Sequence, residues 1–292
     1  MNLPFQRIAV FGPGLLGGSI AMAVHAAMPQ AELRLWARRT QPLEFARELG
    51  LTDLATTDVA AAAKGADLII LATPIGVFED LAHRMLPSVG RDCVVTDVGS
   101  VKAYVHRTTG EFLTGRHRIF IGSHPMAGAE KQGIESATAD LLEGATVALT
   151  NPHRAAAEHV ERLARFWQML GCSTYTLDPA NHDQTVARIS HVPHILAALC
   201  ARAATFGPVP MADLQRLAAS GFRDTTRVCS GPAGMWADIL WENDVAVRAA
   251  LDDCITDLQK LRDLLEEQDK TAVREWLETA KQARETIRQE EV

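Results

Sequence analysis

The fold of this 292-residue chain is decided by Ile8-Ala9-Val10-Phe11-Gly12-Pro13-Gly14-Leu15-Leu16-Gly17-Gly18-Ser19. A short apolar run breaks into glycines and then resumes as an Ala-rich apolar segment through Val24. This order predicts a buried strand over 7–11, a tight turn and the start of a helix. Gly12, Gly14 and Gly17 have the GxGxxG spacing of dinucleotide-binding folds.

Each glycine of this motif has its own physical purpose. Gly12 allows a sharp turn, Gly14 lets backbone N–H groups approach a pyrophosphate, and Gly17 allows the helix to pack closely on its strand. The N-terminus of the helix adds unpaired N–H groups and a partial positive charge. We therefore predict cofactor contacts at Gly12, Pro13, Gly14, Leu15, Leu16 and Gly17. The alternatives are an empty glycine turn and a signal peptide, and the glycines and proline argue against the second.

Composition limits the classes of protein to consider. With 47% hydrophobic and 22% charged residues, the chain reads as soluble and globular. A formal net charge of -7 with scattered Lys and Arg predicts no nucleic-acid partner. No apolar run approaches about twenty residues, so no membrane span is expected. Five cysteines, odd in number and without CxxC spacing, indicate reduced buried thiols in a cytoplasmic protein and no metal site.

Strand and helix signals alternate through the first part of the chain, which implies an α/β fold with a doubly wound sheet. After the first strand, further strands are predicted over 32–36, 66–72, 93–96, 118–121, 145–149 and 174–177, all as parts of this sheet. Ligands of such sheets bind beyond the carboxyl ends of the strands. We therefore expect Thr73, Ser100 and His124 to meet in one crevice beside the cofactor, with Thr73 near its nicotinamide half.

The end of the second strand indicates the cofactor. A fold that prefers NAD usually has Asp or Glu there, bonded to the ribose 2′-hydroxyl. This sequence has Ala37-Arg38-Arg39-Thr40 instead. Because two guanidiniums can pair with a phosphate and no carboxylate repels it, we predict NADP, with NAD as the alternative. The other interpretation is that Arg38 and Arg39 are solvated loop charges.

Strand signals stop at Asp178-Pro179, so we predict a dinucleotide-binding domain over 1–178 and a helical substrate and dimerisation domain over 179–292. The expected helices are 181–204, 211–220, 235–267 and 270–289. Their apolar positions exceed what one helical layer can cover, which predicts a homodimer through this half. Residues 221–227 read as a loop entering a helix, and Trp236 and Trp241 as core or dimer packing.

A few polar residues could carry chemistry on a small-molecule substrate. His124, expected just after a strand, can take a hydroxyl proton while hydride leaves the same carbon. Ser100 could orient that hydroxyl or cap a helix, and Lys102 reads as a solvated or phosphate-side cation. His191 and His194 share a helix face, but no third metal ligand with recognisable spacing accompanies them. Arginines at 223 and 227 could hold a carboxylate.

The segments GPGLLGGSI, DVGSVK, GSHPMAGAEKQG, SHVPH and GFRDTTR, in this order, resemble the prephenate/arogenate (cyclohexadienyl) dehydrogenases of tyrosine biosynthesis, the TyrA-type proteins. The resemblance implies oxidative decarboxylation of a cyclohexadienol with hydride transfer to NAD(P). It implies that His124 accepts the hydroxyl proton, that Ser100 binds the same hydroxyl, and that Arg227 holds a substrate carboxylate. Glu130 and His194 would also contact the substrate.

Two departures from the family pattern bear on specificity. Some relatives have Thr where this chain has Ala129, and many have an acid where it has Ala37, which again favours NADP. From its length we also expect no appended regulatory domain. The rival functions are a β-hydroxyacid dehydrogenase, which normally needs a lysine in its helical domain where this chain has none before Lys260, and a non-catalytic NADP-binding sensor. Prephenate and arogenate are not distinguished.

Overall fold

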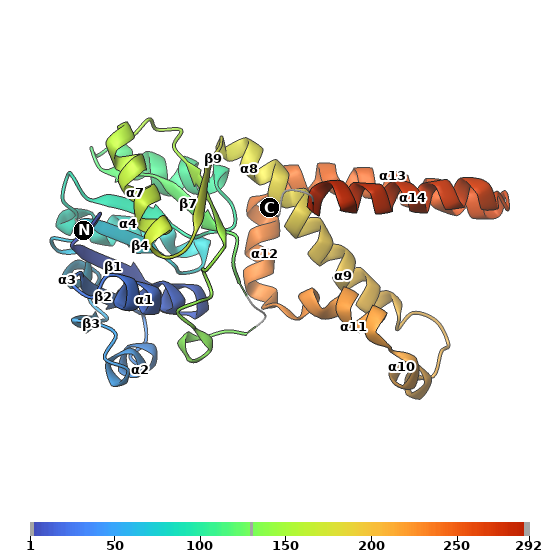
Figure 1. Ribbon diagram of the computed structural model, residues 1–292, viewed down its shortest axis with the longest axis horizontal. Helices are drawn as coiled ribbons and strands as arrows, with labels where there is room; N and C mark the ends of the chain where they lie inside the picture. The colour runs from blue at the N-terminus through green and yellow to red at the C-terminus, as the bar shows by residue number, and fades with distance from the viewer. Residues whose placement is uncertain (1–2, 129–130, 289–292) are drawn as a thin grey trace. The chain divides into compact units, whose positions relative to one another are not determined.

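The computed structural model describes residues 3–128 and 131–288. Within these ranges, six parallel strands form the main sheet in the order β3-β2-β1-β4-β5-β6 (Figure 1). Their bounds are β1 Arg7–Phe11, β2 Glu32–Trp36, β3 Leu54–Thr56, β4 Leu68–Leu71, β5 Val94–Asp97 and β6 Ile119–Phe120. This is the strand order of the doubly wound dinucleotide-binding fold, whose direction switches between β1 and β4. The predicted fold class is confirmed.

Helices cover both faces of the main sheet, which is why its strands are continuous apolar runs. Ile8 and Val10 of β1 face a cluster that contains α1 (Leu15–Ala27), α2 (Gln41–Glu48) and α7 (Ala157–Met169). The alternate residues Ala9 and Phe11 face a second cluster with α3 (Val59–Ala63), α4 (Phe78–Met85) and α6 (Glu111–Thr114). The glycine turn after β1 is therefore anchored by two apolar cores.

A separate three-stranded sheet is also present in the described part of the chain, in the order β7-β8-β9. It contains β7 (Gly122–Pro125), β8 (Thr146–Thr150) and β9 (Ser173–Thr176), with β7 antiparallel to β8. The prediction that strands near 145–149 and 174–177 complete the main sheet is wrong. The chain changes sheets after the two-residue β6, where a Cβ on Gly122 would lie 2.5 Å from Thr150 Oγ1, so only glycine allows this approach.

His124 is affected by this change of sheets. It lies within β7, paired in register with Ala148 of β8, and not in a segment after a strand as predicted. Its backbone is therefore held by sheet hydrogen bonding, which fixes the direction of its side chain more firmly than a loop would.

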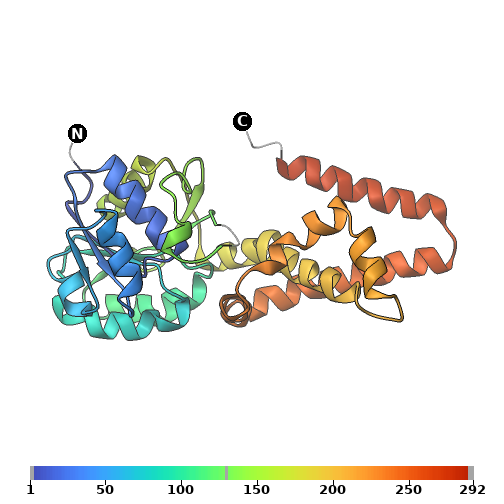
Figure 2. The same ribbon diagram turned by 90° about the horizontal axis from the view of Figure 1, so that it is seen from below.

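The elements that follow β9 are helical (Figure 2), and a short helix α5 (Ala103–Val105) continues into a π-helical turn (His106–Gly110) after β5. Those after β9 are α8 Pro179–Val186, a π-helical turn Ala187–His191, α9 Val192–Ala203, α10 Met211–Leu217, α11 Ser220–Thr226, a 3₁₀ turn Arg227–Ser230, α12 Ala233–Glu242, α13 Asp244–Glu266 and α14 Lys270–Arg288. The predicted loop at 221–227 is mostly α11. The helix predicted over 235–267 is divided at Asn243, whose buried side-chain amide donates to the carbonyl of Asp183 instead of pointing to solvent.

By its internal contacts the chain separates into residues 1–244 and residues 245–292. The first unit includes α12 because Ile239 is buried in the same apolar cluster as Phe11 and Leu71. Within the second unit, Trp276 Nε1 of α14 donates to Asp257 of α13 at 3.0 Å. The boundary at 178/179 between the two expected domains stays a prediction.

Three findings concern other expectations from composition. Each of the five cysteines is free, but only Cys93 and Cys172 are buried and Cys200 is exposed, so the expectation of buried thiols holds for two of them. Among the described helices, none combines the length and apolar character needed to cross a bilayer. Across 3–128 and 131–288, no cluster of three or more His, Cys, Asp or Glu side chains could hold a metal ion.

Candidate active site

The glycine turn between β1 and α1 is shaped by close contacts. Gly12 has a φ of 98°, and a Cβ there would lie 2.7 Å from Thr73 Cγ2. A Cβ on Gly17 would lie 2.2 Å from the Gly12 carbonyl oxygen, so helix and turn touch directly. A Cβ on Gly14, in contrast, would meet no atom within 4 Å. Packing therefore requires glycine at positions 12 and 17, whereas position 14 faces open space.

Beside this turn is a cavity of about 650 Å³ at the carboxyl ends of β1, β2 and β4. Its lining includes Gly12, Pro13, Gly14, Arg38, Arg39 and Thr73 from the predicted cofactor residues. Leu15, Leu16 and Gly17, in the first turn of α1, are not among the residues that line it. Since Gly14 is the N-cap and has no side chain, the first N–H groups of α1 receive no side-chain cap. Open space, helix N-terminus and arginines together fit a dinucleotide.

The cavity also contains a feature that was not predicted from the sequence. The Arg84 guanidinium lies over the Trp36 ring, 5.9 Å from its centroid, and pairs with Asp80 at 3.1 Å. All three residues line the cavity. An aromatic ring covered by a guanidinium forms a flat wall at the end of β2, next to Arg38 and Arg39.

A buried ion pair lies where β5 ends. Lys102 Nζ contacts the Asp97 carboxylate, both side chains are fully buried, and Nζ also donates to the Ser123 carbonyl at 2.8 Å. Asp97 in turn accepts from the backbone N–H of Ser123 at 3.2 Å. Burial raises the pKa of Asp97 and lowers the pKa of Lys102, and their mutual attraction opposes both shifts. The sequence suggested a solvated cation at Lys102, and this prediction is wrong. Lys102 is buried, and its hydrogen bond to the Ser123 carbonyl holds β7 just before His124.

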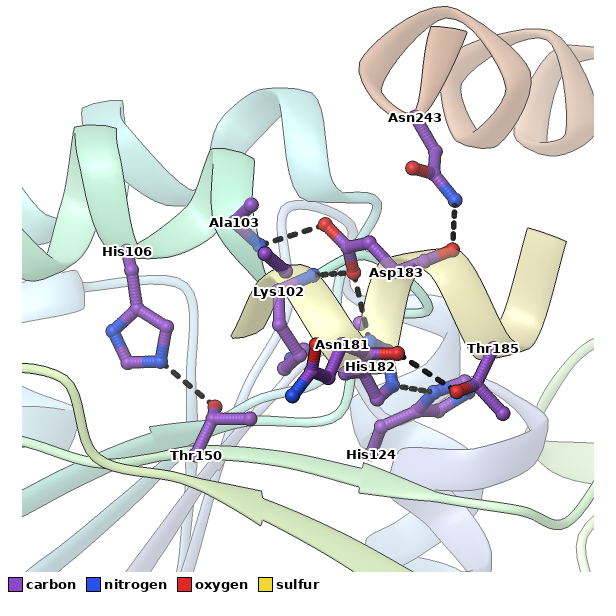
Figure 3. Close-up of polar contacts among 12 residues, drawn as sticks. Lys102, Ala103, His106, His124, Thr150, Asn181, His182, Asp183, Thr185 and Asn243 are labelled. Carbon is purple, nitrogen blue, oxygen red and sulfur yellow. Dashed lines mark hydrogen bonds and ion pairs between the residues drawn. The ribbon is translucent and has the colours of Figure 1, made fainter. Parts of the chain in front are cut away.

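His124 is the first member of a polar chain into α8 (Figure 3). Its Nδ1 lies 2.9 Å from His182 Nε2, and His182 Nδ1 lies 2.7 Å from Asp183 Oδ1. Asp183 also accepts from the backbone N–H groups of Lys102 and Ala103, each at 2.8 Å. Burial lowers the pKa of His124 well below its usual 6.5, and the neighbouring His182 and Lys102 lower it further. A neutral imidazole in this place can act as a base.

From Asp183 the polar chain continues toward the other predicted substrate residues. Asn243 donates to the Asp183 carbonyl at 2.9 Å and lies 3.1 Å from His191 Nδ1. His191 meets the edge of Trp236, and His194 stacks on the face of the same ring with centroids 3.5 Å apart. The two histidines thus share an aromatic neighbour. Trp236, which was predicted to serve only in packing, also contacts two predicted polar residues of the site. Trp241 is 79% exposed and belongs to no core of the described chain.

Arg227 and Ser100 lie in segments that adjoin residues of the polar chain. Helix α9, which carries His194, packs against the 3₁₀ turn Arg227–Ser230. Ser100 is half-buried in the segment between Asp97 and Lys102. Glu130 and Ala129 lie outside the described residues. The structure thus joins the surroundings of Ser100, His124 and His194 by contacts, while their meeting with Thr73 in one crevice stays a prediction.

His182, Asp183 and Asn243 were not singled out from the sequence. The one available signal was the adjacent His-Asp pair at the start of the helix predicted over 181–204. Such pairs are common, and the partners of Asp183 lie 81 and 80 residues away along the chain.

The strand order, the glycine turn and the cavity define a protein of the doubly wound dinucleotide-binding class. Two family models cover nearly the whole chain: prephenate dehydrogenase, nucleotide-binding domain, matches residues 20–176, and prephenate dehydrogenase, dimerization domain, matches residues 178–290. The chain belongs to the prephenate dehydrogenase family.

Individual relatives agree with this assignment. A cyclohexadienyl dehydrogenase of Zymomonas mobilis is 32% identical over 281 residues, which are 96% of this chain and 95% of that protein. A Bacillus subtilis prephenate dehydrogenase is 32% identical over 98% of this chain and 77% of its own length. Among solved structures, the prephenate dehydrogenase of Aquifex aeolicus in complex with hydroxyphenyl propionate and NAD+ has a TM-score of 0.90 at 28% identity, covering 98% of this chain and 100% of that one.

Proposed function

We propose that the chain catalyses the oxidative decarboxylation of prephenate, arogenate or both, with hydride transfer to NADP, in tyrosine biosynthesis. In this reaction the ring carbon that bears the hydroxyl loses hydride, the hydroxyl loses its proton, and the ring carboxylate leaves as CO2 while the ring becomes aromatic. The nicotinamide, when bound, is the hydride acceptor. The observation that carries the proposal is the buried His124, which is held by β7 and by His182 in a family of dehydrogenases.

The roles that we propose for the chain's own residues are those that the family resemblance implies, and burial and charge support some of them. His124 accepts the hydroxyl proton, because burial keeps the imidazole neutral and so leaves one ring nitrogen with a free lone pair. Ser100 orients the same hydroxyl from the segment after β5. Arg227 holds a carboxylate of the anionic substrate as a guanidinium can, and His194 and Glu130 contribute further substrate contacts. Aromatisation supplies much of the driving force, so the protein mainly has to align the reacting groups.

The preference for NADP is supported by the cavity. Arg38 and Arg39 line it, whereas position 37 carries alanine and no carboxylate. A 2′-phosphate at the end of β2 would gain two guanidinium partners. We expect Arg38→Ala combined with Arg39→Ala to raise the KM for NADP at least about tenfold, with little effect on the KM for NAD. The control is Arg91→Ala, an exposed arginine outside the cavity. Equal effects on both cofactors would remove the arginines from phosphate recognition.

A four-way assay tests the proposed function. Pure protein is mixed with prephenate or arogenate and with NADP or NAD, and the reduced cofactor is followed by its absorbance. Turnover with at least one pair is expected, and NADP should give the higher kcat/KM. If NADP binds but none of the four pairs reacts, the protein is the non-catalytic sensor instead.

Oligomeric state and compartment belong to the same proposal. The chain forms a homodimer through its helical half, because α10 and α11 bury none of their own residues and expose Met211, Leu217 and Phe222. The match to a dimerization domain over 178–290 supports a dimer through this half of the chain. The free cysteines fit a reducing cytoplasm. Sedimentation of the pure protein tests the dimer, and a monomer at micromolar concentration would contradict it.

A further inference from the structure

We infer that His182 and Asp183 are positioning residues that fix the tautomer of His124, so that Nε2 of His124 is the ring nitrogen that takes the substrate proton. This inference rests on the proposed function for the role of His124. It concerns a contact between strand β7 and helix α8, and all of the groups involved are drawn in Figure 3.

Asp183, whose side chain is almost fully buried, determines the first proton position. An ionised carboxylate can only accept hydrogen bonds. Among the described residues, its oxygens face the backbone N–H groups of Lys102 and Ala103 and the Nδ1 of His182, at 2.7–2.8 Å. The two backbone N–H groups can only donate, so the carboxylate oxygens of Asp183 accept from both. His182 Nδ1 must therefore carry the proton of that third hydrogen bond.

The proton on Nδ1 determines the other nitrogen of His182. In a neutral imidazole one nitrogen donates and the other accepts. With Nδ1 protonated, His182 Nε2 is an acceptor, and it lies 2.9 Å from His124 Nδ1. His124 Nδ1 must then be the donor of this bond, which leaves the lone pair of His124 on Nε2. A base needs this lone pair, so the polar chain selects the reactive tautomer.

The same arrangement serves after proton transfer. When His124 Nε2 has taken the hydroxyl proton, the imidazolium still donates from Nδ1 to His182, and the negative charge of Asp183 lies at the next hydrogen bond. The charged groups nearest to His124 include Lys102, which disfavours the imidazolium. Lys102 is itself paired with Asp97, so the carboxylate of Asp183 remains as the compensating charge along the polar chain.

The positions of both residues are fixed independently of the substrate. Asp183 binds the segment 102–103 through its side chain, while its own carbonyl accepts from Asn243. His182 is 2% exposed, and its ring meets that of His124 edge-on, with centroids 5.1 Å apart. Buried residues that hydrogen-bond a catalytic ring, directly or through one another, hold this ring in one orientation without touching the substrate.

The direct test is the tautomer itself. Protein labelled with ¹⁵N-histidine is studied by long-range ¹H–¹⁵N correlation near neutral pH, and the His124 signals are identified by their loss in His124→Asn. We expect Nδ1–H and a bare Nε2 in the native protein. A native protein with Nε2–H on His124 would overturn the inference. This measurement needs no turnover, so it stays decisive even if the four-way assay finds no activity.

Two substitutions at His182 separate positioning from packing. A glutamine side chain keeps an oxygen that can accept from His124 Nδ1–H, so His182→Gln should retain the native tautomer and kcat within about threefold. His182→Leu removes the acceptor, so we expect the Nδ1–H tautomer to lose its dominance and kcat with prephenate and NADP to fall at least about tenfold, with KM nearly unchanged. Thr185→Ala, an exposed position on the same helix, is the matched control with native kcat.

The outcomes of these substitutions are distinct. A native kcat and tautomer in His182→Leu would overturn the inference. A fall in kcat that is equal in the glutamine and leucine variants, with the tautomer preserved in both, would also overturn it, because packing alone would then explain the loss. If His182→Leu does not fold, the native tautomer and the His182→Gln variant still decide.

Discussion

The glycine turn allows a prediction in which folding and cofactor binding are separated by two neighbouring substitutions. A Cβ at Gly17 would lie 2.2 Å from the Gly12 carbonyl oxygen and 3.0 Å from Ala72 Cβ, so the backbone itself has to move. Such overpacking costs about 3 kcal/mol at the upper end of its usual range. Alanine in place of glycine within a helix returns about 1 kcal/mol. The net loss for Gly17→Ala is therefore about 2 kcal/mol.

At about 2–4 °C per kcal/mol for a chain of this size class, this loss lowers Tm by about 4–8 °C. Gly14→Ala is the matched variant, because its φ of -84° suits alanine and its Cβ meets no atom within 4 Å. Its Tm should change by less than about 4 °C, since only a cap preference of under about 1 kcal/mol is lost.

Gly14→Ala should instead weaken NADP binding at least about tenfold, because its methyl group fills the space that a pyrophosphate would take. Thermal unfolding followed by circular dichroism and calorimetric titration with NADP measure the two effects. If Gly17→Ala unfolds at the native Tm, Gly17 is not required for packing. If Gly14→Ala keeps the native affinity for NADP, Gly14 is not required for the approach of the pyrophosphate.

Three further predictions concern titratable groups. His124→Asn should lower kcat about a hundredfold while the Kd for NADP is kept, and because burial holds the pKa of His124 well below 6.5, kcat/KM should stay level down to pH 6.5 and fall only at lower pH. Burial lowers the pKa of His106 to about 3, so the unfolded chain binds a proton there first. The free energy of unfolding should therefore fall between pH 6.5 and 3, by up to about 1.4 kcal/mol per pH unit, and less steeply in His106→Asn, as urea titrations can show. Lys102→Met should cost about 3–5 kcal/mol by leaving Asp97 buried without its partner, and adding Asp97→Asn should restore more than half.

The parts of the fold that could be predicted are those with short-range causes. The β1 strand, the glycine turn and the start of α1 follow from a few adjacent residues, and the order of strands and helices implied the doubly wound sheet. The second sheet could not be predicted, because it depends on how closely Gly122 approaches Thr150, a residue far along the chain. Asn243 also divided a periodic pattern that reads as one helix, since its role is a contact with Asp183.

The candidate site divides in a similar way. Arg38, Arg39 and Thr73 were predicted from a rule about strand ends, and they line one cavity. Lys102 was misjudged, because a lysine in a polar segment is usually solvated and its burial depends on the carboxylate of Asp97 at the end of β5. A charged residue beside a strand end is therefore ambiguous until the neighbouring strand is placed.

The contact between Asp183 and residues 102–103 links the docking of α8 to the protonation of the catalytic histidine. The same carboxylate that docks α8 on the segment after β5 also holds the proton on His182, so correct docking and the reactive tautomer of His124 arise together. Loss of the base alone should leave the docking contacts intact, whereas Asp183→Asn replaces an acceptor that faces backbone donors on both sides and should weaken docking and catalysis at once. A variant at Asp183 with native stability and lowered kcat would show that the two are separable, and that the docking contacts lie elsewhere on α8.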